Sequence, residues 1–408
     1  MSRRAGLWTA FLIVHAALIG LGLVNRGASG DVWQMYRSWA DSALSGAGVP
    51  GVTEAWVYPA VALVPMLIAG LMHAFAGYTV SWGVLVAALD ALTFALLIGR
   101  AHSRGRTEAA WFWLGASLAL GGVGMYRLDG VTVPIAIAGG LWLVGRPWLG
   151  SALLILATWI KVWPAAMVAA AVIAVRRRGA VLGAAAVVSA AVVLIVAALG
   201  GAPHMLGFVT EQTTRSLQLE APVSTPYLWL ATFGVGGASV YLNHDIITME
   251  VTGPFIDAVV SAMTPVMAVA MLAIVVIGAF KAWRGASFAA LFPALSLALV
   301  LAFVVFNKVG SPQYMIWLVP PVVIGLAIDR RRWRTPAIAV IGILAITQAI
   351  FPWFYPALLA LHPVIVLALT LRNVSLVVLL AWMVIRVVHV RSRSARRTSA
   401  AEPTLGAG

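Results

Sequence analysis

Residues 176–199 read RRRGAVLGAAAVVSAAVVLIVAAL. The run from residue 180 to 199 carries no charged side chain, and about 20 apolar residues suffice for a helix to cross a bilayer. The three arginines in front of it indicate which end faces the cytoplasm, because positive residues are retained on that side. This stretch therefore predicts a membrane-spanning helix with a fixed orientation.

The whole chain has the composition of such a helix. Of 408 residues, 62% are hydrophobic and only 10% are charged, whereas soluble domains carry about 25% charged residues. This composition excludes a soluble globular protein and a disordered one. Cysteine is absent, which excludes disulfides, thiolate metal sites and cysteine nucleophiles.

Similar apolar runs predict about twelve spans in all. They are residues 7–24, 80–99, 109–125, 131–145, 148–160, 164–175, 180–199, 258–280, 289–306, 315–328, 336–350 and 374–390. The first run is too long for the core of a signal peptide and is interpreted as a signal anchor. Two further runs, 58–77 and 357–371, are predicted to be juxtamembrane or re-entrant helices on the outer side.

With these spans, most of the 27 Lys and Arg residues lie in short inner loops, as the positive-inside rule requires. Both termini are then cytoplasmic. Residues 1–390 form one membrane domain, and residues 391–408 are predicted to be a disordered basic tail. The net charge of +14 is an orientation signal, so we expect no nucleic-acid partner. Function is expected on the outer face, where the loops at about 25–79 and 200–257 are long.

The first outer loop contains a predicted amphipathic helix. Apolar residues recur at helical spacing from Val32 to Ala43, which is typical of a helix lying in the membrane interface. Asp31 stands directly before it. Either Asp31 caps the helix or it is a general base presented by the helix end; spacing alone favours the cap. Tyr58, at the start of the second outer helix, is by composition an interfacial anchor.

Charged residues at or within the predicted spans are costly and need partners. Asp90 lies in mid-span and is either functional or a polar lock between helices. Lys161 separates two short runs, interpreted as half-helices that meet at a shielded cavity, where it could neutralise an anion or extend to the interface.

Four cationic residues are predicted to border one outer cavity, which would suit a lipid phosphate or diphosphate. They are Arg127, Lys161, Lys308 and Arg215. Arg372 is assigned to an outer loop. No histidine has a partner at ligand spacing, so we expect neither metal nor cofactor.

Several of these residues together resemble a known family. Asp31, followed by Tyr36, Trp39, Gly46 and Tyr58-Pro59, resembles the first-loop signature of the GT-C superfamily of polyprenol-phosphate-sugar glycosyltransferases. Similarity is greatest to the bacterial polyprenol-phosphate-mannose-dependent alpha-mannosyltransferases of phosphatidylinositol mannoside and lipomannan assembly, and to some arabinofuranosyltransferases.

Three later motifs also resemble the enzyme that adds the first mannose to GPI-anchor precursors. They are Arg127-x-Asp129, Lys161-x-x-Pro164 and the stretch from Asn307 to Tyr314. The resemblance extends from about residue 7 to 390. The chain departs from it in having one acid where several members have Asp-x-Asp, and in lacking a Trp-Asp-x-His-His stretch.

The resemblance implies an all-α polytopic membrane protein with the GT-C fold. It implies inverting transfer of a hexose, most simply mannose, from a polyprenyl-phosphate donor to a glycolipid or lipoglycan acceptor, with Asp31 as general base. Lys161, Lys308 and Arg127 would bind the donor phosphate. The residues implied to contact substrate are Tyr36, Tyr58, Asp129, Gln313 and Tyr314.

The same resemblance implies a metal-independent, cofactor-free enzyme in a bacterial plasma membrane, acting as a monomer among membrane lipids. Three alternatives remain. The donor sugar is arabinofuranose, the protein is a transporter or flippase of an anionic lipid-linked substrate, or it is a scaffold subunit of a cell-envelope complex.

Overall fold

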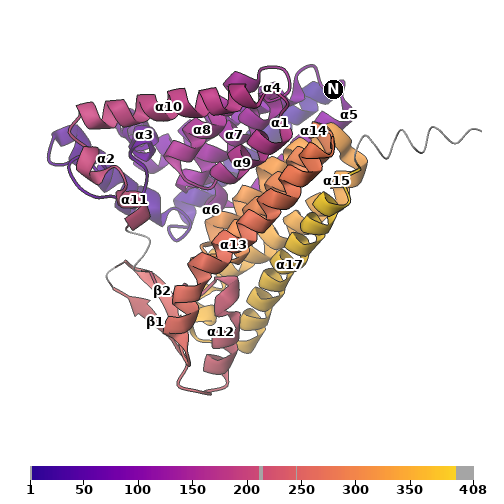
Figure 1. Cartoon of the computed structure of the whole chain (residues 1–408). Coiled ribbons are helices and arrows are strands. Elements are labelled where there is room, and N and C mark those ends of the chain that lie inside the picture. Colours follow the sequence, from indigo (N-terminus) through magenta and orange to yellow (C-terminus); the bar gives the residue numbers. More distant parts are fainter. Residues whose placement is uncertain (1, 211–214, 245, 392–408) are drawn as a thin grey trace, which may run out of the picture.

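The computed structural model describes residues 2–210, 215–244 and 246–391. Within them the chain is mostly helical, with one two-stranded hairpin (Figure 1). The predicted multi-pass helical membrane protein is confirmed at this level. The number of about twelve spans stays a prediction, because four further apolar helices of the described part are shorter than 18 residues. Seven segments of the described part are long and apolar enough to cross a membrane. They are Arg3–Val24, Tyr78–Ile98, Arg178–Ala198, Ile256–Trp283, Phe288–Val305, Pro312–Trp353 and Pro363–Val388. The predicted tail, apart from Arg391, lies outside the described residues.

The N-terminal half is built from eleven α-helices, several of them short. They are α1 Arg3–Val24, α2 Arg37–Ser45, α3 Leu63–Ala76, α4 Tyr78–Ile98, α5 Arg104–Leu120, α6 Gly122–Met125, α7 Leu128–Trp142, α8 Pro147–Ile160, α9 Ala165–Ala174, α10 Arg178–Ala198 and α11 Gly207–Thr210. The first begins at a side-chain cap, where Ser2 accepts a hydrogen bond from the backbone N–H of Ala5, which such N-terminal groups need.

The C-terminal half contains the hairpin and longer helices. Its elements are α12 Thr225–Thr232, β1 Ser239–Asn243, β2 Thr248–Thr252, α13 Ile256–Trp283, α14 Phe288–Val305, α15 Val319–Gln348, α16 Tyr355–Leu359 and α17 Pro363–Val388. The antiparallel strands pair Tyr241 with Glu250. This hairpin was not predicted, because its two short strands lie in a loop expected to be irregular.

Three predicted spans have different boundaries from those expected. The run 109–125 is broken at Gly121, whose φ of 61° suits glycine, so it becomes α5 and α6. The runs 315–328 and 336–350 are joined in α15, which has a non-helical residue at Asp329. The basic residues 330–334, expected to form a loop between them, lie in α15 directly after this break.

The placement of Arg372 in an outer loop is wrong. The predicted outer helix 357–371 and the last span belong largely to one helix, α17, and Arg372 is buried within it. Its Nη2 donates a hydrogen bond of 2.9 Å to the carbonyl oxygen of Glu220. An arginine can remain in an apolar helix when its donors meet acceptors from neighbouring segments.

The predicted half-helices on either side of Lys161 are present as α8 and α9. Lys161 itself is extended, with φ −154° and ψ 138°. Helix α8 packs very closely on α7: a Cβ built on Gly150 would lie 2.6 Å from the carbonyl oxygen of Gly139. Small residues permit such close approach between membrane helices, and this contact fixes α8 beside α7.

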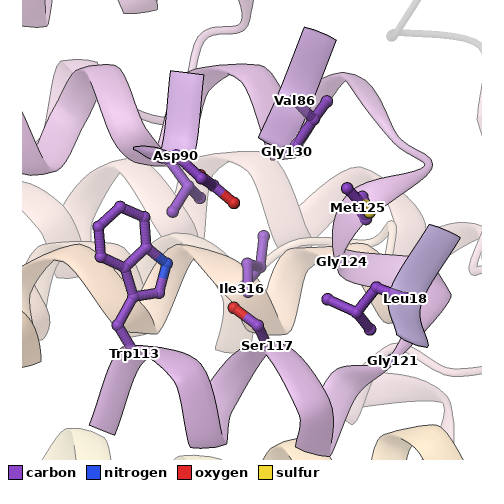
Figure 2. Close-up of a pocket in the computed structure, with 11 residues that line it drawn as sticks. Leu18, Val86, Asp90, Trp113, Ser117, Gly121, Gly124, Met125, Gly130 and Ile316 are labelled. Atoms are coloured by element: carbon purple, nitrogen blue, oxygen red, sulfur yellow. The ribbon is translucent and has the colours of Figure 1, made fainter. Parts of the chain in front are cut away.

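Asp90 has a partner that the sequence did not indicate. Its Oδ2 lies 2.9 Å from Nε2 of His15 on α1, and the other ring nitrogen of His15 lies 2.9 Å from the carbonyl oxygen of Phe11. Asp90 also faces a cavity of about 20 Å³ together with Ser117 on α5 (Figure 2). That volume is about enough for one water molecule. The geometry favours the polar lock between α1 and α4.

Candidate functional site

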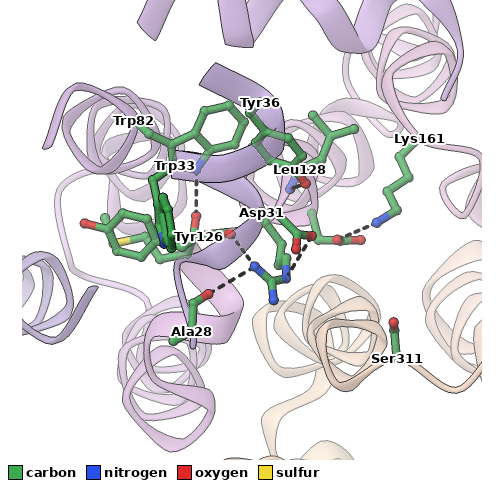
Figure 3. A network of polar contacts seen from close by, with 12 residues as sticks. Ala28, Asp31, Trp33, Tyr36, Trp82, Tyr126, Leu128, Lys161 and Ser311 are labelled. Atoms are coloured by element: carbon green, nitrogen blue, oxygen red, sulfur yellow. Dashed lines mark hydrogen bonds and ion pairs between the residues drawn. The ribbon is translucent and has the colours of Figure 1, made fainter. Parts of the chain in front are cut away.

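Two ion pairs meet at the N-terminus of α7 (Figure 3). Arg127 precedes the helix in an extended conformation, and its Nε lies 3.2 Å from Oδ2 of Asp31. Asp129, in the first turn of α7, accepts a hydrogen bond of 2.6 Å from Nζ of Lys161. The structure thus brings together four residues singled out from three distant parts of the sequence.

Asp31 is not a helix N-cap. It is the first residue of a π-helical turn, Asp31–Tyr36, whose N-cap is Gly30. The turn continues directly into α2, so the predicted amphipathic helix is present with a changed start. With the cap interpretation excluded, the ion pair with Arg127 is the contact that the carboxylate makes within the described residues.

The backbone holds the Arg127 guanidinium in place. Its Nη1 donates to the carbonyl oxygens of Ala28, at 3.1 Å, and Tyr126, at 3.3 Å. The Tyr36 hydroxyl accepts a hydrogen bond from the backbone N–H of Leu128. Tyr36 is fully buried, and burial raises its pKa, so it stays neutral and braces the start of α7. Tyr36 therefore supports the backbone at the start of α7, and its contact with substrate stays a prediction.

The two carboxylates differ in what they can still bind. Asp129 is 0% exposed, and its oxygens accept hydrogen bonds from Lys161 and from Nε1 of Trp317. The Asp31 side chain is 28% exposed and accepts no hydrogen bond from the described residues. A general base must reach the proton it removes. Of the two, Asp31 has the accessible oxygens that this requires.

Aromatic rings surround the Lys161 ammonium. Its Nζ lies 5.6 Å from the ring centre of Tyr58, 5.8 Å from that of Tyr314 and 6.0 Å from that of Trp317. Such contacts stabilise a cation by about 0.5–2 kcal/mol each. Burial, with a further contribution from Asp31, raises the pKa of Tyr58, so its hydroxyl remains a donor.

A cavity of about 390 Å³ adjoins Lys161. This is the size of a small-molecule site. The site residues predicted from sequence that line it are Tyr58, Lys161, Lys308, Gln313 and Tyr314. Four other predicted site residues do not line the cavity: Asp31, Tyr36, Arg127 and Asp129. Of these, Asp129 contacts the lining through its hydrogen bond with Lys161.

Part of the cavity wall is positively charged. Arg215 and Lys308 both line it. Burial and the neighbouring Arg215 lower the pKa of Lys308, while Glu250 raises it. The buried Nε of Arg215 has no hydrogen-bond partner in the described part of the chain. A buried donor without an acceptor is costly, so this wall is suited to an anionic group.

The segment before Glu220 was missed by the sequence analysis. Gln218 donates its backbone N–H to the carbonyl oxygen of Lys308, and its Oε1 accepts from the N–H of Gly310. A Cβ on Gly310 would lie 2.3 Å from Cα of Ala221, so only glycine fits there. These contacts hold the segment from Gln218 to Ala221 against residues 308–310, which border the cavity.

Glu220 is a buried carboxyl near the ion pairs. Burial raises its pKa to about 7, and the charges of Arg372 and Arg127 offset part of that effect. The sequence did not single out Glu220, because no local motif links it to its charged neighbours. Those neighbours lie on α17 and at the start of α7.

We expect Glu220→Gln to flatten the pH dependence of stability. The folded pKa of about 7 lies above the ordinary 4.5, so between these values the folded state holds a proton that the unfolded chain has released. Stability is then full below pH 4.5 and falls by about 3 kcal/mol as the pH rises through 7. Thermal unfolding in detergent at pH 5 and 8 measures this. The control is Glu54→Gln, at an exposed carboxyl; equal pH dependence in all three proteins would contradict the prediction.

Within the described residues, no group of three or more His, Asp or Glu side chains is arranged to hold a metal ion. Comparisons with known proteins gave no match: no family model matches the chain, and no curated protein or solved structure is significantly similar. The functional assignment rests on the site geometry and on the sequence motifs.

Proposed function

We propose that the chain is an integral membrane glycosyltransferase. It moves a hexose, in the first instance mannose, from a polyprenyl-phosphate donor to a glycolipid or lipoglycan acceptor on the outer face. The observation that carries the proposal is an accessible carboxylate, Asp31, ion-paired to Arg127 beside a cavity lined by Lys161, Arg215 and Lys308. The sequence motifs support the same reaction.

The proposed reaction is a direct displacement. Asp31 accepts the proton of the acceptor hydroxyl while that oxygen forms a bond to C1 of the sugar. The bond from C1 to the phosphate oxygen breaks, and the polyprenyl phosphate leaves with the electron pair. Arg215 and Lys308 face the oxygen on which charge develops. The configuration at C1 is inverted, so a beta-linked donor gives an alpha-linked product.

The mixed lining of the cavity supports a lipid-linked sugar. Gln313 and Tyr314 offer hydrogen-bonding groups for sugar hydroxyls. Phe303, Phe306 and Met267, from α14, the turn that follows it and α13, supply an apolar wall suited to the first isoprene units. A donor anchored in the bilayer would then enter sideways between helices.

A transporter of an anionic lipid is the second candidate. It is favoured by one feature, the pair of short helices α8 and α9 that meet at Lys161, because transporters use broken helices at their substrate sites. It predicts movement of the lipid without a new glycosidic bond.

The deciding experiment is transfer by the purified protein in proteoliposomes. Labelled polyprenyl-phosphate-mannose and polyprenyl-phosphate-arabinose are supplied in parallel with extracted envelope glycolipids, with and without a chelator. We expect labelled glycolipid from one donor, unchanged by the chelator. Translocation of intact donor without product would favour the transporter, and no product from either donor would overturn the proposal.

Removing the positive wall is expected to weaken donor binding. Arg215→Gln and Lys308→Gln should each raise KM for the donor about 10- to 100-fold, since hydrogen bonds to charged groups contribute about 1.5–3 kcal/mol. The matched control is Arg37→Gln, because Arg37 is exposed and pairs with Asp41 on α2. A donor KM equal in all these variants and the native protein would contradict this role.

A further inference from the structure

A second large cavity lies at the opposite ends of the same helices. It measures about 510 Å³ and is bounded by the loop between α9 and α10 and the loop between α13 and α14. Helix α9 begins four residues after Lys161 and ends at this second cavity, and α14 begins here and ends next to Lys308. The two cavities are thus separated by the lengths of α9 and α14.

The second cavity carries positive charge without a neighbouring acid. Arg176 and Arg178 line it, and Arg177, Lys281 and Arg284 lie in or beside the same two loops, neither of which contains Asp or Glu. Among the described residues, none of these five forms an ion pair with a carboxylate. Elsewhere on this side of the helices, by contrast, Arg330 and Arg334 both pair with Glu108. The charge around this cavity is therefore not neutralised by any residue that the structure describes.

The surface leading to the cavity is apolar and regular. Leu272, Val276 and Phe280 on α13 are all exposed, and their spacing of four residues puts them on one face of the helix. Trp283 ends that helix next to the cavity and is 77% exposed. Exposed tryptophan is typical of the headgroup level of a bilayer. An apolar stripe therefore runs to a cationic cavity at headgroup depth.

We propose that this cavity binds the phosphate headgroup of an anionic phospholipid, with the acyl chains along the apolar stripe of α13. The arginine fork matches phosphate oxygens with paired hydrogen bonds. The apolar stripe and the exposed Trp283 put the cavity at the level of the lipid headgroups, which is the reason for assigning a lipid and not a soluble phosphate. The positive-inside rule assigns the site to the cytoplasmic leaflet. This lipid site is independent of the proposed transfer reaction.

The test is native mass spectrometry of the delipidated, full-length protein titrated with phosphatidylglycerol or phosphatidylcholine. The double variant Arg176→Gln/Arg178→Gln removes the lining charges. Its matched control, Arg100→Gln/Arg104→Gln, removes the same charge from exposed residues away from the cavity.

The native protein and the control should bind phosphatidylglycerol at least about tenfold more tightly than the cavity variant does, and phosphatidylcholine should bind all three weakly. Equal loss in the two double variants would mean a general charge effect and would overturn the site. Displacement of the lipid by millimolar inorganic phosphate, with equal thermal stabilisation by phosphate alone, would overturn the lipid as the ligand.

Discussion

Asp31→Asn is expected to lower the turnover number for glycosyl transfer about 100- to 10,000-fold, the contribution typical of a general base. Asparagine has nearly the same shape as aspartate but cannot accept the proton. The cavity proposed to bind the donor is lined by other residues, so KM for the donor should change little. The measurement is the initial rate at saturating donor and acceptor, with thermal unfolding recorded alongside.

The matched control for this variant is Asp41→Asn. Asp41 lies on α2, which continues the turn that begins at Asp31, and its side chain is 57% exposed and paired with Arg37. Surface substitutions of this kind usually change stability by less than about 0.5 kcal/mol, so transfer should be unaffected. If Asp31→Asn kept the native rate, the carboxylate would be only the partner of Arg127, and the assignment of a base would be wrong.

The helical membrane architecture was predictable because lipid imposes it. Long apolar runs indicate membrane spans directly, whereas the orientation inferred from the bias of the arginines stays a prediction. The boundaries were less predictable. Arg372 interrupts an apolar run, which is typical of a loop, whereas in α17 its Nη2 donates to the carbonyl oxygen of Glu220. That acceptor lies 152 residues away along the chain, and no local pattern indicates it.

The candidate site was predictable as a set of residues but not as a geometry. Polar side chains at the ends of apolar runs are few, so four of them could be singled out: Asp31, Arg127, Asp129 and Lys161. Which of them pair could not be inferred, because the pairing depends on how the first loop and α8 meet α7. The same reason hid His15 as the partner of Asp90, 75 residues along the chain.

Lys161→Met is expected to destabilise the folded protein by about 3–5 kcal/mol, because it leaves the buried Asp129 charge without its partner. The pair is nearly inaccessible: the Lys161 side chain is 12% exposed and that of Asp129 is 0%. Trp317 would remain the only side-chain hydrogen-bond donor to the Asp129 carboxylate within the described residues. The midpoint of thermal unfolding, followed by tryptophan fluorescence, measures the effect.

The double variant Asp129→Asn/Lys161→Met separates structure from donor binding. Removing both charges should recover most of the lost stability, since the penalty of Lys161→Met is that of one unpaired charge. If Lys161 also contacts the donor phosphate, the double variant will fold yet keep a raised KM for the donor. Should Lys161→Met keep the native unfolding temperature and lose only donor affinity, the ion pair contributes little to the fold and Lys161 is a phosphate ligand. A stable double variant with native KM would instead make Lys161 a purely structural partner of Asp129 and leave Arg215 and Lys308 as the cations that face the phosphate.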